Sequence, residues 1–450
     1  MSKPIRITRA AVRRYDTLKN RSSAAVIGGR RGWHLETRPW DLAVITSYRP
    51  ILRLALGSVS AALVAMALAG VAAADPVAWV SAMPNASLAV SDGRRLVIAE
   101  RPDRALIPAS TMKLIIALAA IERWGLAHRF ETRFYQDAAD RLWIRGGGDP
   151  YLVSEELDRV VQGLKAAGVR SVAGIGLDAE LFGTEVMIPG RSSSNNPYDA
   201  PVTALAVNFN TVSLLVSGGR VESAEPQTPL TATAERIGRG LGPGRHRVNL
   251  GDSERALAHF GELIQAKLRQ GGITVAGPVE IGAVPRSATG VYTHRNGLTL
   301  ETVLANMLEY STNFIANDLF LLLGEQNGRA SMARSQRALE QWARRTFGWR
   351  DVRIEDGAGL SRGNQLSARQ LLDVLERLRP HRQLLPQQDD EPAVRAKTGT
   401  LTGVSTYAGF VRRGREWFPF SLMINQPVAY GLRLQLASEL ARSPTLGAWQ

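Results

Sequence analysis

Residues 107–125, IPASTMKLIIALAAIERWG, predict a turn followed by a helix that is apolar on nearly all sides. A helix of this kind is a buried one, so the chain has to fold around it. Its first turn nevertheless carries Ser110 and Lys113. A lysine there opposes the helix dipole, and its burial costs free energy unless something compensates.

Ser110 and Lys113 share one face of the predicted helix, because they are three residues apart. The free N–H groups of a helix N-terminus favour developing negative charge. A serine hydroxyl is a weak nucleophile without a base, and a desolvated lysine can act as that base. Alternatively, Ser110 is a helix cap and Lys113 extends its amine to the surface. S-x-x-K is short enough to occur by chance, so it leaves both interpretations open.

Two later motifs favour catalysis. EYSTNFIAND contains Ser311 and Asn313, and RAKTGTLTG contains Lys397-Thr398-Gly399-Thr400 on a predicted strand. The order S-x-x-K, S-x-N, K-T-G is the signature of penicillin-binding proteins and serine β-lactamases.

On these motifs the chain resembles low-molecular-mass class C penicillin-binding proteins, the D-alanyl-D-alanine carboxypeptidase/endopeptidase family of peptidase S13 type. The resemblance runs from about residue 80 to 440 and includes GGGDPYL, APVTALAVNFN, DGAGLSR and RAKTGTLTGVSTYAGFV. It implies an α/β fold of the serine β-lactamase/D,D-peptidase type, with an antiparallel sheet and flanking helices. Ser110 and Ser311 are 201 residues apart, far more than in compact β-lactamases. The resemblance therefore implies that an inserted strand-rich domain interrupts the fold.

The expected organisation has four segments. They are an N-terminal basic extension with a signal segment (1–75), a first catalytic part (76–144), the inserted domain (145–290) and a second catalytic part (291–450). Helical patterns are expected at 155–168, 253–270, 299–325, 367–379 and about 430–442. A hairpin is expected around Asp92–Gly93, strands before and after 137–140, a strand and tight turn in DVRIEDGAGLS, and three strands after residue 393.

The family resemblance also implies roles for the motif residues. Ser110 attacks the carbonyl of the penultimate D-Ala, and Lys113 takes the hydroxyl proton. Burial and nearby Lys397 favour the neutral form of Lys113. Ser311 relays the proton to the leaving amine, and Asn313 orients the substrate amide and Lys113.

The K-T-G strand is expected to bind substrate. Lys397 and Thr398 attract the terminal carboxylate, and Gly399 leaves room for substrate backbone to pair along the strand. Backbone N–H groups of Ser110 and Thr400 form the oxyanion hole.

Arg362, in DGAGLSRGN, matches a family position that can contact the carboxylate of a diaminopimelate side chain. A surface arginine after a turn is an equally good interpretation.

The charge is concentrated at the N-terminus. Residues 1–75 hold 12 Lys and Arg against 4 Asp and Glu, which gives +8 of the total +14. Arg53 precedes an apolar run that ends in small residues, typical of a secretory signal with cleavage near Ala74–Asp75. An uncleaved membrane anchor is the alternative. We expect a periplasmic protein, with membrane association left open.

Motifs that are missing from the sequence argue against several other classes of protein. It has no cysteine, no H-E-x-x-H and no RNA-recognition motif, so no cofactor, metal or nucleic-acid partner is expected. We expect a serine D,D-peptidase whose partners are peptidoglycan stem peptides, with β-lactams as covalent inhibitors. A β-lactamase or a non-catalytic wall-binding or β-lactam-sensing receptor are the alternatives. Carboxypeptidase and endopeptidase action, and the oligomeric state, stay open.

Overall fold

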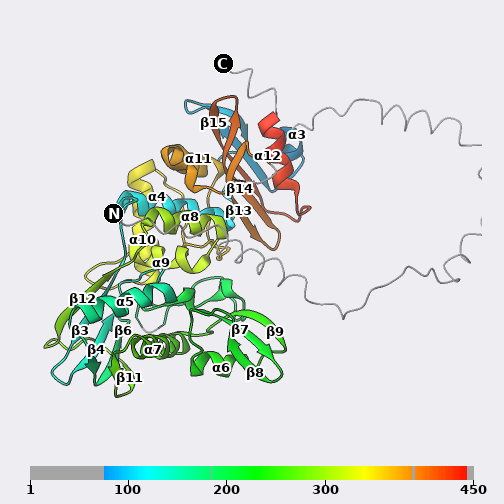
Figure 1. The fold of residues 1–450 in the computed structure, drawn as a ribbon. Coiled ribbons are helices and arrows are strands. Elements are labelled where there is room, and N and C mark those ends of the chain that lie inside the picture. Colours follow the sequence, from blue (N-terminus) through cyan, green and yellow to red (C-terminus); the bar gives the residue numbers. More distant parts are fainter. Residues whose placement is uncertain (1–75, 184, 388–390, 443–450) are drawn as a thin grey trace, which may run out of the picture. The chain divides into compact units, whose positions relative to one another are not determined.

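The three motifs lie around a five-stranded antiparallel sheet. The computed structural model describes residues 76–442 except 184 and 388–390 (Figure 1). In spatial order the strands are β13 (Val394–Leu401), β14 (Val404–Arg413), β15 (Glu416–Ile424), β1 (Ala86–Ser91) and β2 (Leu96–Glu100). The chain thus enters the sheet at β1 and returns three hundred residues later to complete it, so the sheet joins both ends of the described chain.

Helices cover both faces of this sheet. The helices of this region are α3 (Pro76–Ser81), α4 (Met112–Trp124), α8 (Leu300–Tyr310), α9 (Asn313–Leu323), α10 (Met332–Phe347), α11 (Ala368–Leu378) and α12 (Leu432–Arg442). α4 and α11 share a hydrophobic core with one face of the sheet, whereas α3 and α12 pack on the other. Because both faces are buried, β14 and β15 are apolar along most of their length.

The apolar helix expected after Ser110 is confirmed as α4. Every residue from Met112 to Ala120 is buried, and the helix ends at Gly125, whose φ of 74° suits glycine. α4 therefore lies at the centre of the core.

The helix expected at 299–325 is in fact two helices, α8 and α9. Ser311 ends α8 in the left-handed conformation, with a φ of 53°, and Thr312 precedes α9 in an extended one. Apolar periodicity runs through the break because a single left-handed residue hardly changes it. The break places Ser311 and Asn313 at helix ends, where their side chains can serve a site.

Two further expectations were wrong or incomplete. In DVRIEDGAGLS, the expected strand is reduced to an isolated bridge between Arg353 and Gln365, because its backbone is bound by side chains instead. α10 was not anticipated, since its many arginines leave a narrow apolar stripe.

Among the described residues, the segment between α4 and α8 builds three further sheets. A five-stranded mixed sheet contains β11 (Val279–Ile281), β6 (Gly174–Asp178), β4 (Arg141–Arg145), β3 (Glu131–Gln136) and β12 (Thr289–Arg295). A three-stranded sheet contains β8 (Arg220–Ser223), β7 (Thr211–Ser217) and β9 (Gly244–Asn249), and a short parallel pair joins β5 (Ser171–Val172) to β10 (Thr274–Val275). The helices are α5 (Ser154–Ala166), α6 (Ala232–Gly238) and α7 (Ser253–Gln270). The mixed sheet draws strands from both sides of the expected boundaries at 145 and 290.

The expected signal segment lies outside the described residues. Within the described part of the chain, no helix is both long and apolar enough to cross a membrane.

Candidate active site

Ser110 lies in a tight 3-10 turn, Ala109–Thr111, that leads into α4. Ala109 has a φ of 47°, a conformation that non-glycine residues seldom adopt. Two glycines allow this turn to approach its neighbours. A Cβ on Gly359 would collide with the Ala109 carbonyl, and one on Gly399 would lie 2.9 Å from Ser110 N. The backbone strain and the close packing hold the hydroxyl at a fixed place.

Lys113 is fully buried and reaches Ser110 directly. Its Nζ lies 3.0 Å from Ser110 Oγ, 2.9 Å from Asn313 Oδ1 and 2.8 Å from the carbonyl oxygen of Ala358. An ammonium has three hydrogens to donate, so these three contacts compensate much of the cost of burial. A neutral amine would donate two and turn its lone pair to the Ser110 hydroxyl. The alternative interpretation, in which Lys113 extends its amine to the surface, is therefore wrong.

The carbonyl of Ala358 is fixed by the turn that follows α10. Asp356 Oδ1 accepts hydrogen bonds from the N–H groups of Ala358 and Gly359, at 2.8 and 2.7 Å. Asn317, on α9, accepts from the N–H groups of Gly357 and Ala358. Asp356 thus stabilises the turn that holds Lys113. Sequence reasoning missed Ala358 and Asn317, because one acts through its backbone and the other lies outside the motifs.

Asn313 joins the site to the inserted segment. Its Oδ1 accepts from Lys113, and its Nδ2 donates to the Tyr198 carbonyl at 3.0 Å. Ser311, which is half-buried, stands two residues earlier at the break between α8 and α9. The hydrogen bond with Lys113 brings Asn313 to the start of α4.

Lys397 is the second buried lysine of the site, with 1% of its surface exposed. Its Nζ donates to the Thr398 carbonyl at 2.8 Å. β13 is an edge strand, and the N–H of Ala396 points away from β14 to Pro386. Because successive residues alternate, the backbone groups of Thr398 and Thr400 also face away from β14, and no described strand pairs with β13 on that side. This edge can accept an added strand.

Arg362 lies at the end of this strand. Its side chain is exposed, and Nη2 donates to the Thr402 carbonyl at 2.6 Å. Arg433, at the start of α12, was missed by sequence reasoning because it belongs to no motif. Its Nη1 donates to the Gly399 carbonyl and to Thr400 Oγ1, at 2.8 and 2.7 Å.

Asp318 is a fully buried acid on α9, one residue after Asn317. Burial raises its pKa well above the ordinary value, and nearby Asp149 raises it further. Asp318 is thus held towards its protonated form.

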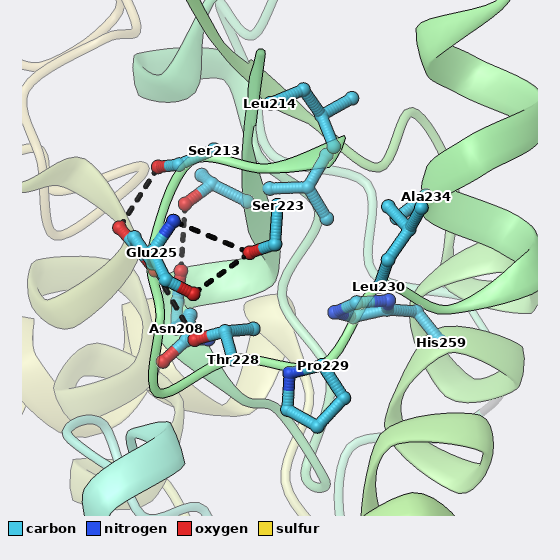
Figure 2. A pocket seen from close by; sticks show the side chains of 12 residues that line it. Asn208, Ser213, Leu214, Ser223, Glu225, Thr228, Pro229, Leu230, Ala234 and His259 are labelled. Atoms are coloured by element: carbon cyan, nitrogen blue, oxygen red, sulfur yellow. Dashed lines mark hydrogen bonds between the residues drawn. The ribbon is translucent and has the colours of Figure 1, made fainter. Parts of the chain in front are cut away.

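Two pockets elsewhere do not contain the motif residues. One, in the inserted segment, is lined by Ser213, Glu225 and His259 among others (Figure 2) and has about 10 Å³ of space, enough for a single water. The other has about 960 Å³ and lies where the far end of α4 meets the mixed sheet. Residues of the three motifs line neither pocket. The hydrogen-bonded cluster at the start of α4 is therefore a better candidate for the active site than either pocket.

Known proteins match both the sequence and the fold. The family model of the D-Ala-D-Ala carboxypeptidase 3 (S13) family matches residues 82–236 and 252–389. The D-alanyl-D-alanine carboxypeptidase of Actinomadura sp. (strain R39) is 27% identical over 397 residues, covering 71% of this chain and 73% of that protein.

Solved structures agree with the fold. Penicillin binding protein 4 from Haemophilus influenzae superposes with a TM-score of 0.66 at 21% identity, covering 81% of this chain and 98% of that one. Its complex with a β-lactam gives a TM-score of 0.61 at 22% identity, covering 82% and 98%. The expected α/β fold and the resemblance drawn from the motifs are confirmed. The chain belongs to the D-Ala-D-Ala carboxypeptidase 3 (S13) family of serine D,D-peptidases.

Proposed function

We propose that Ser110 is the nucleophile of this serine D,D-peptidase and forms an acyl-enzyme with peptidoglycan stem peptides. The observation that carries the proposal is the 3.0 Å contact between Ser110 Oγ and the Nζ of the fully buried Lys113. A nucleophile and a base within hydrogen-bond reach, with the base held by further partners, is the arrangement that covalent catalysis requires.

In the first step, Lys113 in its neutral form takes the proton of Ser110 as Oγ attacks the carbonyl of the penultimate D-Ala. Asn313 and the Ala358 carbonyl hold Nζ in place during this transfer. The negative charge that develops on the substrate oxygen is met by the N–H groups of Ser110 and Thr400. Fixed donors of this kind act at the point where charge develops.

In the second step, the bond to the leaving amine breaks as Ser311 donates its hydroxyl proton to that amine. Ser311 in turn takes up the proton that Lys113 removed from Ser110. Ser311 suits this role because it stands at the α8–α9 break beside Asn313. Water then hydrolyses the acyl-enzyme and restores the Ser110 hydroxyl.

The free edge of β13 binds the substrate as an added strand. Lys397 and Thr398 attract the terminal carboxylate, and the absence of a side chain at Gly399 lets the strand approach Ser110. Arg362, beyond the end of β13, is placed to meet an acidic side chain of the stem peptide. β-Lactams bind the same groups and acylate Ser110.

The inserted unit extends from β3 to β12 in this proposal, because these strands share one sheet. The protein acts in the periplasm, where its substrate lies, after export by the N-terminal segment.

The test is D-Ala release from a stem pentapeptide by the wild type and by Ser110→Ala. The expected result is loss of release in the variant and normal release in Ser287→Ala, a matched change at an exposed turn. Release by Ser110→Ala at the wild-type rate contradicts the proposal. If the wild type hydrolyses penicillin rapidly but releases no D-Ala, the protein is a β-lactamase. If it does neither, it is a receptor.

A further inference from the structure

Arg433 approaches the reactive strand from the side opposite to α4. α12, which carries it, packs on the face of the sheet away from α4 and α11 (Figure 1). One of its nitrogens, Nη1, donates both to the Gly399 carbonyl, at 2.8 Å, and to Thr400 Oγ1, at 2.7 Å. Arg433 therefore touches the two residues that complete the substrate-binding strand.

The position is an unfavourable one for a cation. Arg433 is the second residue of α12, where the helix dipole disfavours positive charge. Burial lowers the pKa of its guanidinium, with Tyr430 and Tyr407 acting in the opposite direction. An arginine still remains charged under all ordinary conditions. Arg433, like Lys113, therefore stands where a cation lowers the stability of the fold. This cost indicates that a function retains the arginine at this position.

The hydrogen bond from Arg433 restricts the direction in which the Thr400 hydroxyl can donate its own proton. A guanidinium only donates, so Thr400 Oγ1 is the acceptor in this hydrogen bond. The hydroxyl proton of Thr400 is therefore left to donate to another group. The positive charge beside the oxygen also makes this proton a stronger donor to an anion.

We propose that Arg433 is a positioning residue that turns the Thr400 hydroxyl towards the terminal carboxylate of the substrate. The inference rests on the proposed function, since it assumes that the stem peptide lies along β13. Arg433 also braces the Gly399 carbonyl, which keeps the end of β13 in register with Ser110. It thereby favours substrates that end in a free carboxylate over neutral analogues.

The test compares two substrates of the full-length protein. One is an N-acylated D-Ala-D-Ala dipeptide with its free carboxylate, and the other is the same compound with a C-terminal carboxamide. For Arg433→Ala we expect kcat/KM on the carboxylate to fall about 10- to 100-fold, mainly through KM, and on the carboxamide to change less than about threefold. Arg433→Lys, which keeps the charge but not the planar fork, should lie between these values.

Two controls separate positioning from folding. Arg442→Ala removes an exposed arginine from the last turn of the same helix and should leave both substrates unaffected. In a double-mutant cycle, Thr400→Val should remove most of the effect of Arg433→Ala, because one acts through the other.

Equal losses of kcat/KM on both substrates would overturn the proposal and leave Arg433 a structural residue. Full additivity of Arg433→Ala with Thr400→Val would overturn it as well. Failure of the proposed function would look different, since D-Ala release would then survive Ser110→Ala whatever happens at Arg433.

Discussion

Two regions of the molecule bury ionisable groups, and they do so in different ways. In the motif cluster, formed by Ser110, Lys113, Asn313 and the Ala358 carbonyl, the lysine contacts three neutral oxygens. In the junction cluster, formed by Glu156, Arg159, His294 and Gly297, the carboxylate meets donors and positive charge. Glu156 accepts from His294 Nε2 at 3.0 Å, from Gly297 N at 3.0 Å and from Arg159 at 2.8 Å.

The junction cluster ties α5 to the end of β12 and is arranged for stability. Burial alone would raise the pKa of Glu156, but the hydrogen bonds from His294 and Gly297 and the charge of Arg159 hold it below the ordinary value. In the motif cluster, a base faces a nucleophile across 3.0 Å next to strained backbone. A buried ionisable group therefore indicates an active site when its partners leave it able to exchange a proton with a reactive group.

The largest effect is expected when the base of the motif cluster is removed. Lys113→Met should slow acylation by benzylpenicillin about 100- to 10,000-fold, the usual contribution of a general base. The thermal unfolding midpoint should change little, because an apolar chain fits the buried site without an unpaired charge. The rate of adduct formation by mass spectrometry measures the first effect.

The matched control is Lys165→Met, which alters an exposed lysine on α5. If Lys113→Met were acylated as fast as this control, Lys113 would not be the base. The motif cluster would then not differ in function from the junction cluster.

The second test removes the acid of the junction cluster. Glu156→Ala should lower the free energy of unfolding by about 3–5 kcal/mol, because it leaves buried donors without their acceptor. Urea unfolding followed by fluorescence measures this loss. The acylation rate per folded molecule should stay within about twofold of the wild type. A large loss of acylation with unchanged stability would place Glu156 in the catalytic machinery instead.

The third test uses pH. His259, labelled in Figure 2, is buried in the inserted segment, and its Nδ1 lies 2.8 Å from Thr231 Oγ1. Burial lowers the pKa of His259 to about 4. The unfolded chain takes up this proton near pH 6.5, whereas the folded chain takes it up near pH 4. The contribution to stability is therefore complete above pH 6.5 and is lost as the pH falls towards 4, by up to about 3 kcal/mol.

His259→Gln isolates this contribution. Asp149, whose pKa burial raises to about 6, acts in the opposite direction, since its contribution is lost as the pH rises from about 3.8 to 6. The difference between wild type and variant cancels Asp149, and it should shrink from pH 7 to pH 4 in urea titrations. A difference that is constant with pH would show that His259 titrates normally in the folded protein.

The smallest effect is expected at the rim of the motif cluster. Arg362 is exposed and holds the Thr402 carbonyl, so Arg362→Ala should raise KM for a diaminopimelate-containing peptide by about 2- to 10-fold. The same peptide with lysine in place of diaminopimelate lacks the side-chain carboxylate and should be affected less. Equal changes in KM for the two peptides would return Arg362 to the role of a surface arginine.

The sequence predicted which motif residues meet better than it predicted the breaks between helices. Lys113 contacts Ser110 and Asn313, as the order of the motifs indicated, and α4 and the three last strands follow from strong apolar patterns. The break at Ser311 could not be predicted, since it depends on one left-handed residue within an apolar run.

Other parts of the site were invisible for physical reasons. Ala358 contributes a backbone carbonyl, which any residue could supply. Arg433 reaches β13 only because α12 packs on the sheet, and a local sequence pattern cannot predict such a tertiary contact. The extent of the inserted sheet depends on the pairing of β3 with β12, about 160 residues apart in the chain.

Whether Ser110 is the nucleophile is tested most simply by an intact-mass time course with benzylpenicillin, for the wild type and Ser110→Ala side by side. We expect a long-lived adduct with the mass of the whole drug on the wild type, located by peptide mapping to the segment that contains Ser110, and none on the variant. The same adduct on both proteins, or an intact drug with no adduct on either, would contradict it.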